Sequence, residues 1–304
     1  MCCHAFPAYL TSGPSPPAQV LLDKHPHIRT VVNKVGTIDT QFRFFNMELL
    51  AGEDSTMATV KENGCSFTFD FAKVYWNSRL HTEHERLVGL LGSGQAVVDM
   101  FAGVGPFAIP AAKKGCVVLA NDLNPEAHRC LLQNARSNHV DQQLRGFNMD
   151  AREFVKKAFS LLVEESAQSD NGLPLAKGSH VILNLPGSAV DFLGSLRGVL
   201  SPLPLSLRPV VPLPQIHCYA FTKSDCPAED VQQQVELKVG VALPAAALSV
   251  TRVRDVAPNK LMMRASFELP RSVSYTADTA AGGPPPHSIS HTCNCPCSLY
   301  IYVL

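Results

Sequence analysis

The pattern of apolar and polar positions divides the chain into two parts. From Val20 to about Arg79 the signals are mostly β, and a turn at Glu62–Gly64 joins two alternating segments. Alternation on both sides of an Asn-Gly turn is typical of a β-hairpin. The candidate strands are residues 30–32, 41–45, 58–61 and 65–71. With a helix at about residues 82–91, we predict a small α+β domain over residues 19–91.

From Gln95 onward, apolar strands alternate with segments of helical length. Strands are predicted at residues 95–100, 116–120, 180–183, 215–221, 248–253 and 261–267, and helices at residues 106–114 and 125–137. This alternation favours a parallel sheet with helices on both faces. We predict an α/β domain over residues 92–272.

Three segments lack such periodicity. Residues 1–18 are turn-rich and residues 273–304 are rich in Ala, Gly, Pro and Ser, so we expect a disordered leader and a disordered tail. The Pro-rich residues 200–214 are predicted to be a surface connection.

Composition narrows the class of protein. The chain has 304 residues, 46% hydrophobic and 17% charged, with no net charge, so any nucleic-acid contact must be a local patch. We find no apolar run of membrane-spanning length and no targeting segment. Four cysteines lie singly in apolar segments, Cys65, Cys116, Cys130 and Cys218, which suggests buried thiols and a reducing compartment. We therefore expect a cytoplasmic protein.

A glycine-containing turn follows the first strand of the second part. The strand ends in Asp99, Gly103 and Gly105 follow, and a second strand about twenty residues on ends in Asp122. This geometry suits an adenosyl ligand at the carboxyl ends of parallel strands, with Asp122 near the ribose hydroxyls and a third acid at Asp150. A simple strand-to-helix turn is the alternative. A pyrophosphate is disfavoured because the third glycine of a dinucleotide turn is absent.

Asn184-Leu185-Pro186 follows the predicted strand at residues 180–183. Its carboxamide can both donate and accept hydrogen bonds, which suits the amide-like edge of a nucleobase. The alternative is that Asn184 only caps the following turn.

Several motifs in order then resemble one family. They are residues 42–53, 62–64, 74–86, 99–107, 121–125, 184–186 and 253–260. Together they look like the archaeal and eukaryotic tRNA (guanine-N1)-methyltransferases, over about Val20 to Pro270. The resemblance implies an α/β fold, a Rossmann-like class I domain dependent on S-adenosylmethionine that is preceded by a small α+β domain. It implies methyl transfer to N1 of guanine-37 in tRNA, next to the anticodon.

The resemblance also implies roles for individual residues. Glu83 matches the family's base, Arg43 the group that stabilises charge on guanine O6, and Asn184 the catalytic Asn. Donor-binding positions are Asp99, Phe101, Ala102, Gly103, Val104, Gly105, Pro106, Asp122, Leu123, Asn124, Asp150, Asn184 and Pro186. Substrate-binding positions are Tyr75, Asn77, Arg79 and Lys260.

These residues also have simpler interpretations. Glu83 could pair with Arg79 or Arg86 on a solvated face, and Arg43 could be an edge charge. Tyr75 and Trp76 could stack on an extruded base or belong to the core. Six cations are candidate phosphate contacts that could equally be solvated surface: Lys24, Arg29, Lys34, Arg252, Arg254 and Lys260.

Two departures from the family are apparent. Members of the family have a further N-terminal domain that binds tRNA, and we expect this domain to be missing here. We therefore expect weaker and more salt-sensitive tRNA binding than is usual in the family. Cys293, Cys295 and Cys297 with His287 and His291 could bind zinc, but structural zinc sites more often use ligand pairs separated by a loop, so no metal is expected.

Other functions remain open at this stage. The nearest is a sister enzyme of wybutosine formation that moves the aminocarboxypropyl group of the same donor, although its motif resembles Asn-Leu-Gly where this chain has Pro186. Another possible function is that of a catalytically impaired protein that only binds the donor. Nothing in the sequence demands an oligomer, and we expect a monomer.

Overall fold

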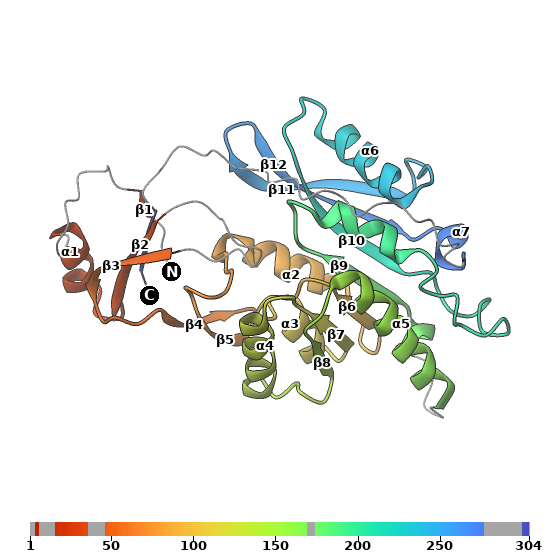
Figure 1. Cartoon of the computed structure of the whole chain (residues 1–304), viewed down its shortest axis with the longest axis horizontal. Coiled ribbons are helices and arrows are strands. Elements are labelled where there is room, and N and C mark those ends of the chain that lie inside the picture. Colours follow the sequence, from red (N-terminus) through yellow and green to blue (C-terminus); the bar gives the residue numbers. More distant parts are fainter. Residues whose placement is uncertain (1–3, 6–15, 36–45, 169–173, 277–299, 304) are drawn as a thin grey trace. The chain divides into compact units, whose positions relative to one another are not determined.

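The structure is a computed structural model that describes residues 4–5, 16–35, 46–168, 174–276 and 300–303. The chain forms two compact units (Figure 1). Unit 1 comprises Met1–Leu80 and Gly282–Leu304, and unit 2 comprises His81–Ala281. Each unit is described by itself.

Unit 1 contains a four-stranded antiparallel sheet with the strand order β1-β13-β2-β3. Helix α1 packs on it, and Ala18, Val31, Leu50 and Ala51 form their shared apolar cluster. The elements of the unit are β1 (His4–Ala5), α1 (Pro16–Lys24), β2 (Thr30–Val35), β3 (Asn46–Gly52), β4 (Met57–Glu62), β5 (Cys65–Asp70), η1 (Ser78–Leu80) and β13 (Tyr300–Val303).

The predicted hairpin is present as β4 and β5, which pair around Asn63 and Gly64. Phe67 and Phe69 point to the buried side of β5, and the indole of Trp76 packs on both rings at centroid distances of 5.4 and 5.1 Å. Trp76 is 8% exposed and therefore belongs to the core.

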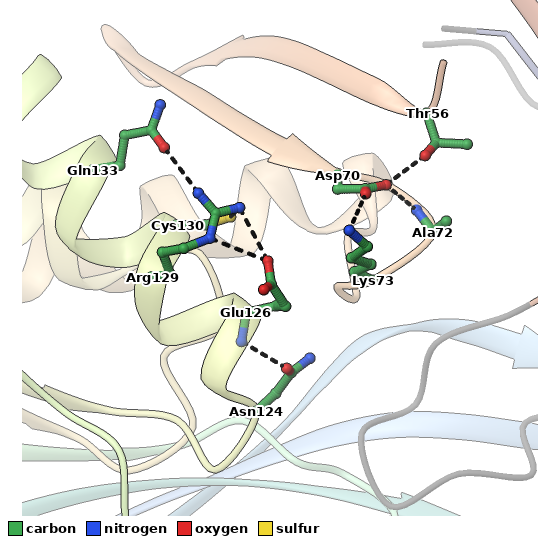
Figure 2. Close-up of polar contacts among 9 residues, drawn as sticks. All are labelled: Thr56, Asp70, Ala72, Lys73, Asn124, Glu126, Arg129, Cys130 and Gln133. Atoms are coloured by element: carbon green, nitrogen blue, oxygen red, sulfur yellow. Dashed lines mark hydrogen bonds and ion pairs between the residues drawn. The ribbon is translucent and has the colours of Figure 1, made fainter. Parts of the chain in front are cut away.

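The end of the hairpin is fixed by Asp70 (Figure 2). Its carboxylate accepts hydrogen bonds from the Thr56 hydroxyl and from the backbone N–H of Ala72, and it pairs with Lys73 at 3.2 Å. These contacts bind the segment after β5 to the segment before β4.

Unit 2 is built on a seven-stranded sheet with the order β11-β12-β10-β9-β6-β7-β8 (Figure 1). The five strands from β10 to β8 run parallel, as predicted. Strand β12 pairs antiparallel with both β10 and β11, so β12 runs against the five strands and β11 runs in their direction. The prediction of an all-parallel sheet is therefore wrong at β12, because a tight turn at Asn259 joins it to β11 instead of a helical crossover. The Rossmann-like α/β prediction is confirmed.

Helices and strands of unit 2 alternate along the chain. Its elements are α2 (His81–Leu90), β6 (Ala96–Asp99), α3 (Ala108–Lys113), β7 (Val117–Asn121), α4 (Pro125–Ser137), β8 (Leu144–Phe147), α5 (Ala151–Gln168), η2 (Pro174–Lys177), β9 (Ser179–Leu183), η3 (Ala189–Leu196), β10 (Gln215–Thr222), α6 (Pro227–Val239), β11 (Leu248–Ala257), β12 (Lys260–Glu268) and α7 (Arg271–Ser274).

Local sequence explains where helices of this unit begin. Helix α4 has Pro125 at its first position, and the Asn124 side chain caps it by accepting from the Glu126 N–H at 3.0 Å (Figure 2). Helix α6 also begins at a proline and ends at Gly240, whose φ is +81°. These signals fix the bounds of α4 at the predicted residues 125–137.

The main core lies where α5, η3 and α6 cover one face of the sheet. Strand residues such as Val98, Leu183 and Cys218 point to this face and are fully buried. The next residue of β10, Tyr219, points to the other face, where its ring lies 6.0 Å from that of Phe107 and its hydroxyl reaches Glu83 of α2.

Several expectations about segments are corrected. The boundary between the units is at Leu80 instead of residue 91, because α2 buries Glu83 and Leu87 within unit 2. Helix α1 begins at Pro16, inside the expected leader, and β13 lies inside the expected tail, where Tyr and β-branched residues favour a strand. Residues 1–3, 6–15 and 277–299 lie outside the described residues.

The Pro-rich connection at residues 200–214 is also only partly a surface segment. Leu200, Leu203 and Val211 are buried in the main core, and Leu205 and Val210 are exposed. The segment therefore covers the edge of the core instead of only crossing the surface.

The cysteine and membrane expectations can be compared with the described residues. Cys65, Cys116, Cys130 and Cys218 are buried free thiols, as predicted. In the part of the chain that the structure describes, no helix is long and apolar enough to cross a membrane. The same part holds no group of three or more potential metal-binding side chains, and the Cys-rich tail lies outside it.

Two histidines form a buried pair at the amino ends of β9 and β10. The rings of His180 and His217 are stacked, and Nδ1 of His180 lies 3.0 Å from Nε2 of His217. Gln95 contacts the outer nitrogen of His180 at 3.1 Å, and Ser266 contacts that of His217 at 3.0 Å. Burial lowers the pKa of His217 from 6.5 to about 3, with the charges of His180 and Arg86 adding to the effect, and burial lowers the pKa of His180 as well.

This pair makes an acid-sensitive contribution to the stability of the fold. The unfolded chain takes up protons on these histidines near pH 6.5 and the folded chain does not, so the contribution of the pair to the free energy of unfolding is highest above pH 6.5 and falls as the pH drops toward about 3. Each imidazole contributes a slope of up to about 1.4 kcal/mol per pH unit.

Urea unfolding at several pH values measures this slope. His217→Gln should flatten it, and His139→Asn is the matched control because His139 is exposed and Asn tolerates its φ of +59°. Equal slopes for the wild type and His217→Gln would contradict the prediction.

Candidate active site

The predicted donor turn lies at the carboxyl end of β6. The carboxylate of Asp99, the last residue of the strand, accepts from the Phe101 N–H at 3.3 Å. The Gly103 N–H donates to Asp122 at 2.8 Å, and the Ala102 N–H donates to the Asn121 carbonyl at 2.8 Å. The turn is thereby bonded to the end of the neighbouring strand β7.

The two glycines of the turn have different roles. Gly103 has a φ of +55°, and a Cβ there would meet nothing within 4 Å. Gly105 has a φ of +104°, and a Cβ there would lie 2.6 Å from Cδ1 of Ile109 and 2.9 Å from Cδ1 of Leu131. Gly105 therefore allows α3 and α4 to pack closely, whereas Gly103 leaves open space beside the turn.

The acids at the strand ends are buried to different extents. Burial, together with the smaller effect of the Asp122 charge, raises the pKa of Asp99 to about 8, although the hydrogen bond from the Phe101 N–H lowers it. Burial also raises the pKa of Asp122, whose two oxygens accept from the N–H groups of Gly103 and Asn124. Asp150 is more open and caps α5 by accepting from the Arg152 N–H at 2.8 Å.

The other predicted donor residues surround this turn. Ala102 and Val104 are buried, Pro106 is half-buried, and Leu123 is 40% exposed. Phe101 is half-buried, and its ring makes an edge contact with Phe192 of η3 at 4.9 Å.

Asn121 is a site residue that sequence reasoning missed. Its buried amide donates to the carbonyls of Met100 and Met149, and its oxygen accepts from the Met149 N–H. It therefore joins the loops after β6, β7 and β8. The signal was an amide beside Asp122 at the end of a buried strand.

Asn184 directly follows β9, so it stands at the same edge of the sheet as Asp99. Its Oδ1 is buried and has no hydrogen-bond partner among the described residues. The Pro186 carbonyl accepts from the Phe221 N–H at 3.1 Å, which fixes the segment to the end of β10. This oxygen can therefore accept a hydrogen bond from a ligand at this edge of the sheet.

Glu83 is 7% exposed, and both of its oxygens carry hydrogen bonds. Arg86 pairs with it in bidentate fashion at 2.8 Å, and the Tyr219 hydroxyl and Arg264 Nη1 donate to Oε1 at 2.7 and 3.3 Å. The expected alternative pairing with Arg86 is thus present, but on a buried carboxylate instead of a solvated face.

Sequence reasoning missed Tyr219 and Arg264. Arg264 is 4% exposed and lies in the apolar strand β12, where a buried cation requires a partner. The Phe107 ring links this cluster to the donor turn, since it touches both Tyr219 and His84 of α2. The structure therefore brings Glu83 close to the predicted donor residues.

The predicted substrate residues are divided between the units. In unit 1, Tyr75 is 47% exposed, and Asn77 donates to its hydroxyl at 3.3 Å and accepts from the Arg79 N–H at 3.1 Å. In unit 2, the Lys260 ammonium lies 4.2 Å from the Phe221 ring centroid. Arg43 lies outside the described residues.

A cleft of about 610 Å³ lies between the end of β10 and the β11–β12 hairpin. Its lining includes Lys223, Arg252, Asp255 and Asn259. Arg252 is paired with Asp255, which offsets part of the positive charge of this surface.

The chain was compared with known proteins. Residues 58–202 match the family model of the TRM5/TYW2 methyltransferase domain, and residues 17–56 match that of the TYW2 N-terminal domain. The chain is 50% identical over 264 residues to the tRNA (guanine(37)-N(1))-methyltransferase of Danio rerio, which covers 86% of this chain and 52% of the relative. The chain thus spans about half the length of its vertebrate relatives.

Among the solved structures that are similar are two Trm5 complexes. The complex of aTrm5 and tRNALeu has a TM-score of 0.60 and 26% identity, covering 83% of this chain and 67% of that chain. Methanocaldococcus jannaschii Trm5 in complex with adenosine has a TM-score of 0.54 and 28% identity, covering 73% and 58%. The chain therefore carries a TRM5/TYW2 methyltransferase domain over residues 58–202 and belongs to that family.

Proposed function

We propose that this protein binds S-adenosylmethionine and transfers its methyl group to N1 of the guanine at position 37 of tRNA. The observation that carries the proposal is the buried Glu83 carboxylate, which Tyr219 and Phe107 connect to the donor turn. The printed activity of the relatives at 44–50% identity supports the same reaction.

The residues present fit the donor. Gly103 leaves open space beside the turn, and the orphaned oxygens of Asp99 and Asn184 face no partner among the described residues. Asp122, Leu123 and Asn124 would hold the adenosine part, and Asp99 and Asn184 would contact the remainder. When bound, S-adenosylmethionine supplies a methyl group on a positively charged sulfur.

The acceptor requires acid–base chemistry from the protein. Guanine N1 carries a proton and becomes nucleophilic only when that proton leaves, so a base is needed. Glu83 would take the proton, and Asn184 would hold the base edge with its carboxamide. Arg43 would stabilise the charge that develops on O6.

A second candidate function has one specific observation in its favour. Residues 17–56 match the TYW2 N-terminal domain, so transfer of the aminocarboxypropyl group remains the rival reaction. Pro186 and the names of the curated relatives favour methyl transfer.

The reaction is tested with a methyl-labelled donor and an unmodified tRNA that bears guanine next to the anticodon. We expect N1-methylguanosine after digestion to nucleosides. An aminocarboxypropyl nucleoside with methylthioadenosine would establish the rival reaction, and donor binding without any product would establish an impaired binding protein.

Donor binding is tested with a pair of glycine variants. Gly103→Ala should abolish detectable donor binding in calorimetry, because the new methyl group fills the space beside the turn. Gly64→Ala is the control, because it has a similar φ of +70° and open surroundings in the β4–β5 turn. Both changes carry a backbone strain of roughly 1–2 kcal/mol. Similar donor affinities for the two variants would refute the placement.

The base is tested with Glu83→Gln. Single-turnover methyl transfer should fall by about 10²–10⁴-fold, whereas donor affinity stays near that of the wild type. Glu126→Gln is the matched control, because Glu126 forms the same (i, i+3) pair with Arg129 on the exposed face of α4 (Figure 2). If Glu83→Gln turns over as fast as the wild type, Glu83 is not the base.

The remaining expectations stay predictions. They are a monomeric state, the absence of a metal and a cytoplasmic location. Gel filtration and metal analysis of the purified protein, and imaging of the tagged chain in cells, would test them.

A further inference from the structure

The two oxygens of the Glu83 carboxylate have unequal surroundings. Oε1 accepts from the Tyr219 hydroxyl at 2.7 Å, from Arg264 Nη1 at 3.3 Å and from Arg86 Nη2 at 2.8 Å. Among the described residues, Oε2 accepts only from Arg86 Nε, at 2.8 Å. Removing Arg86 would therefore leave Oε1 held and Oε2 free.

The partners of Oε1 on the sheet are fixed in place. Tyr219 and Arg264 stand directly opposite each other on the paired strands β10 and β12, and both side chains are buried. Burial raises the pKa of Tyr219 well above 10, and the nearby charge of Glu83 raises it further, so the hydroxyl remains a donor. A buried guanidinium also needs its carboxylate, since an unpaired charge there is costly.

Arg86 is different from these two partners. It lies on the same helix as Glu83, three residues on, and its side chain is 41% exposed. Its guanidinium can turn toward solvent by rotation of its own side chain, without any change in the sheet. Arginine binds phosphate in the same two-pronged way that it binds carboxylate.

We propose that Arg86 shields Oε2 of Glu83 and leaves it for a backbone phosphate when tRNA binds, while Tyr219 and Arg264 hold Oε1. Tyr219 and Arg264 are then positioning residues, and Oε2 is the atom that accepts the proton. The inference rests on the proposed function. In the step itself the N1–H bond breaks, its electron pair stays on N1, and the proton forms an O–H bond with Oε2.

This arrangement links access to Oε2 to nucleic-acid binding. In the free protein the Arg86 guanidinium occupies the side of Oε2 that the sheet residues leave uncovered. A bound phosphate would draw the guanidinium away and let guanine N1–H reach this oxygen. The other titratable groups near the cluster are His84 on α2, Asp99 at the end of β6 and His217 on β10.

The first test measures tRNA binding, which needs no turnover. Arg86→Gln should weaken tRNA affinity by about 10-fold at low salt and reduce the slope of log affinity against log salt by about one. Arg129→Gln is the matched control, because Arg129 pairs with Glu126 at the same spacing on the exposed face of α4. If the salt slope of Arg86→Gln equals that of the wild type, or if both variants lose the same amount of tRNA affinity, the proposed shielding role of Arg86 is wrong.

The second test measures the single-turnover rate against pH. Tyr219→Phe keeps the ring and removes one donor to Oε1, so the acid limb should shift upward by about one pH unit with donor and tRNA affinities unchanged. Arg264→Lys keeps the positive charge and should shift the acid limb by less. This variant replaces Tyr219→Phe in the test if Tyr219→Phe is unstable. A merely structural role would lower the rate equally at every pH, and an unmoved acid limb in both variants would overturn the positioning role.

Failure of the proposed function looks different. In that case the wild type makes no N1-methylguanosine at any pH. The salt slopes of Arg86→Gln and Arg129→Gln would still show whether Arg86 contacts a tRNA phosphate.

Discussion

A buried carboxylate that requires positively charged partners determines how unit 2 of this protein is arranged. Glu83 is almost fully enclosed, and an ionised carboxylate in such a place is stable only when it is paired and hydrogen-bonded. Arg264 and Tyr219 meet this requirement from two adjacent strands. The pairing fixes α2 to the sheet, and it accounts for the position of the boundary between the two units at Leu80.

The donor turn depends on a second set of polar contacts. Gly103 donates to Asp122, and Asn121 bonds the loops that follow three neighbouring strands. These hydrogen bonds to buried groups, together with the buried apolar residues Met100, Ala102 and Val104, determine the shape of the turn. The Phe107 ring then packs between α2 and β10, so the turn and the Glu83 cluster share one packing unit.

Local signals made the turn after β6 and the acids at the neighbouring strand ends predictable from the sequence. Asp99, the glycines after it and the acid ending the next strand all lie within short sequence distances, and their backbone requirements are readable from residue type. Arg264 and Tyr219 were not predictable, because they lie 181 and 136 residues from Glu83. Only the pairing of β10 with β12 reveals that they converge. Strand β12 was assigned as a strand but in the wrong direction, since a strand pattern contains no information on its orientation. The location of Arg43, taken from a family resemblance, stays a prediction.

The stacked histidines at the opposite end of the sheet have a consequence for proton order. The Gln95 side-chain oxygen accepts from the Gly92 N–H as well as facing His180, so the facing nitrogen of His180 carries the hydrogen. The inner nitrogen of His180 must then accept from His217, and His217 must accept from the Ser266 hydroxyl. The tautomers of the two histidines are therefore not independent, and every hydrogen bond in the chain Ser266–His217–His180–Gln95 is donated in one direction, from β12 toward the segment before β6. A shift of either strand pair by one residue would break this chain of hydrogen bonds, so the chain helps to fix the register of β9, β10 and β12.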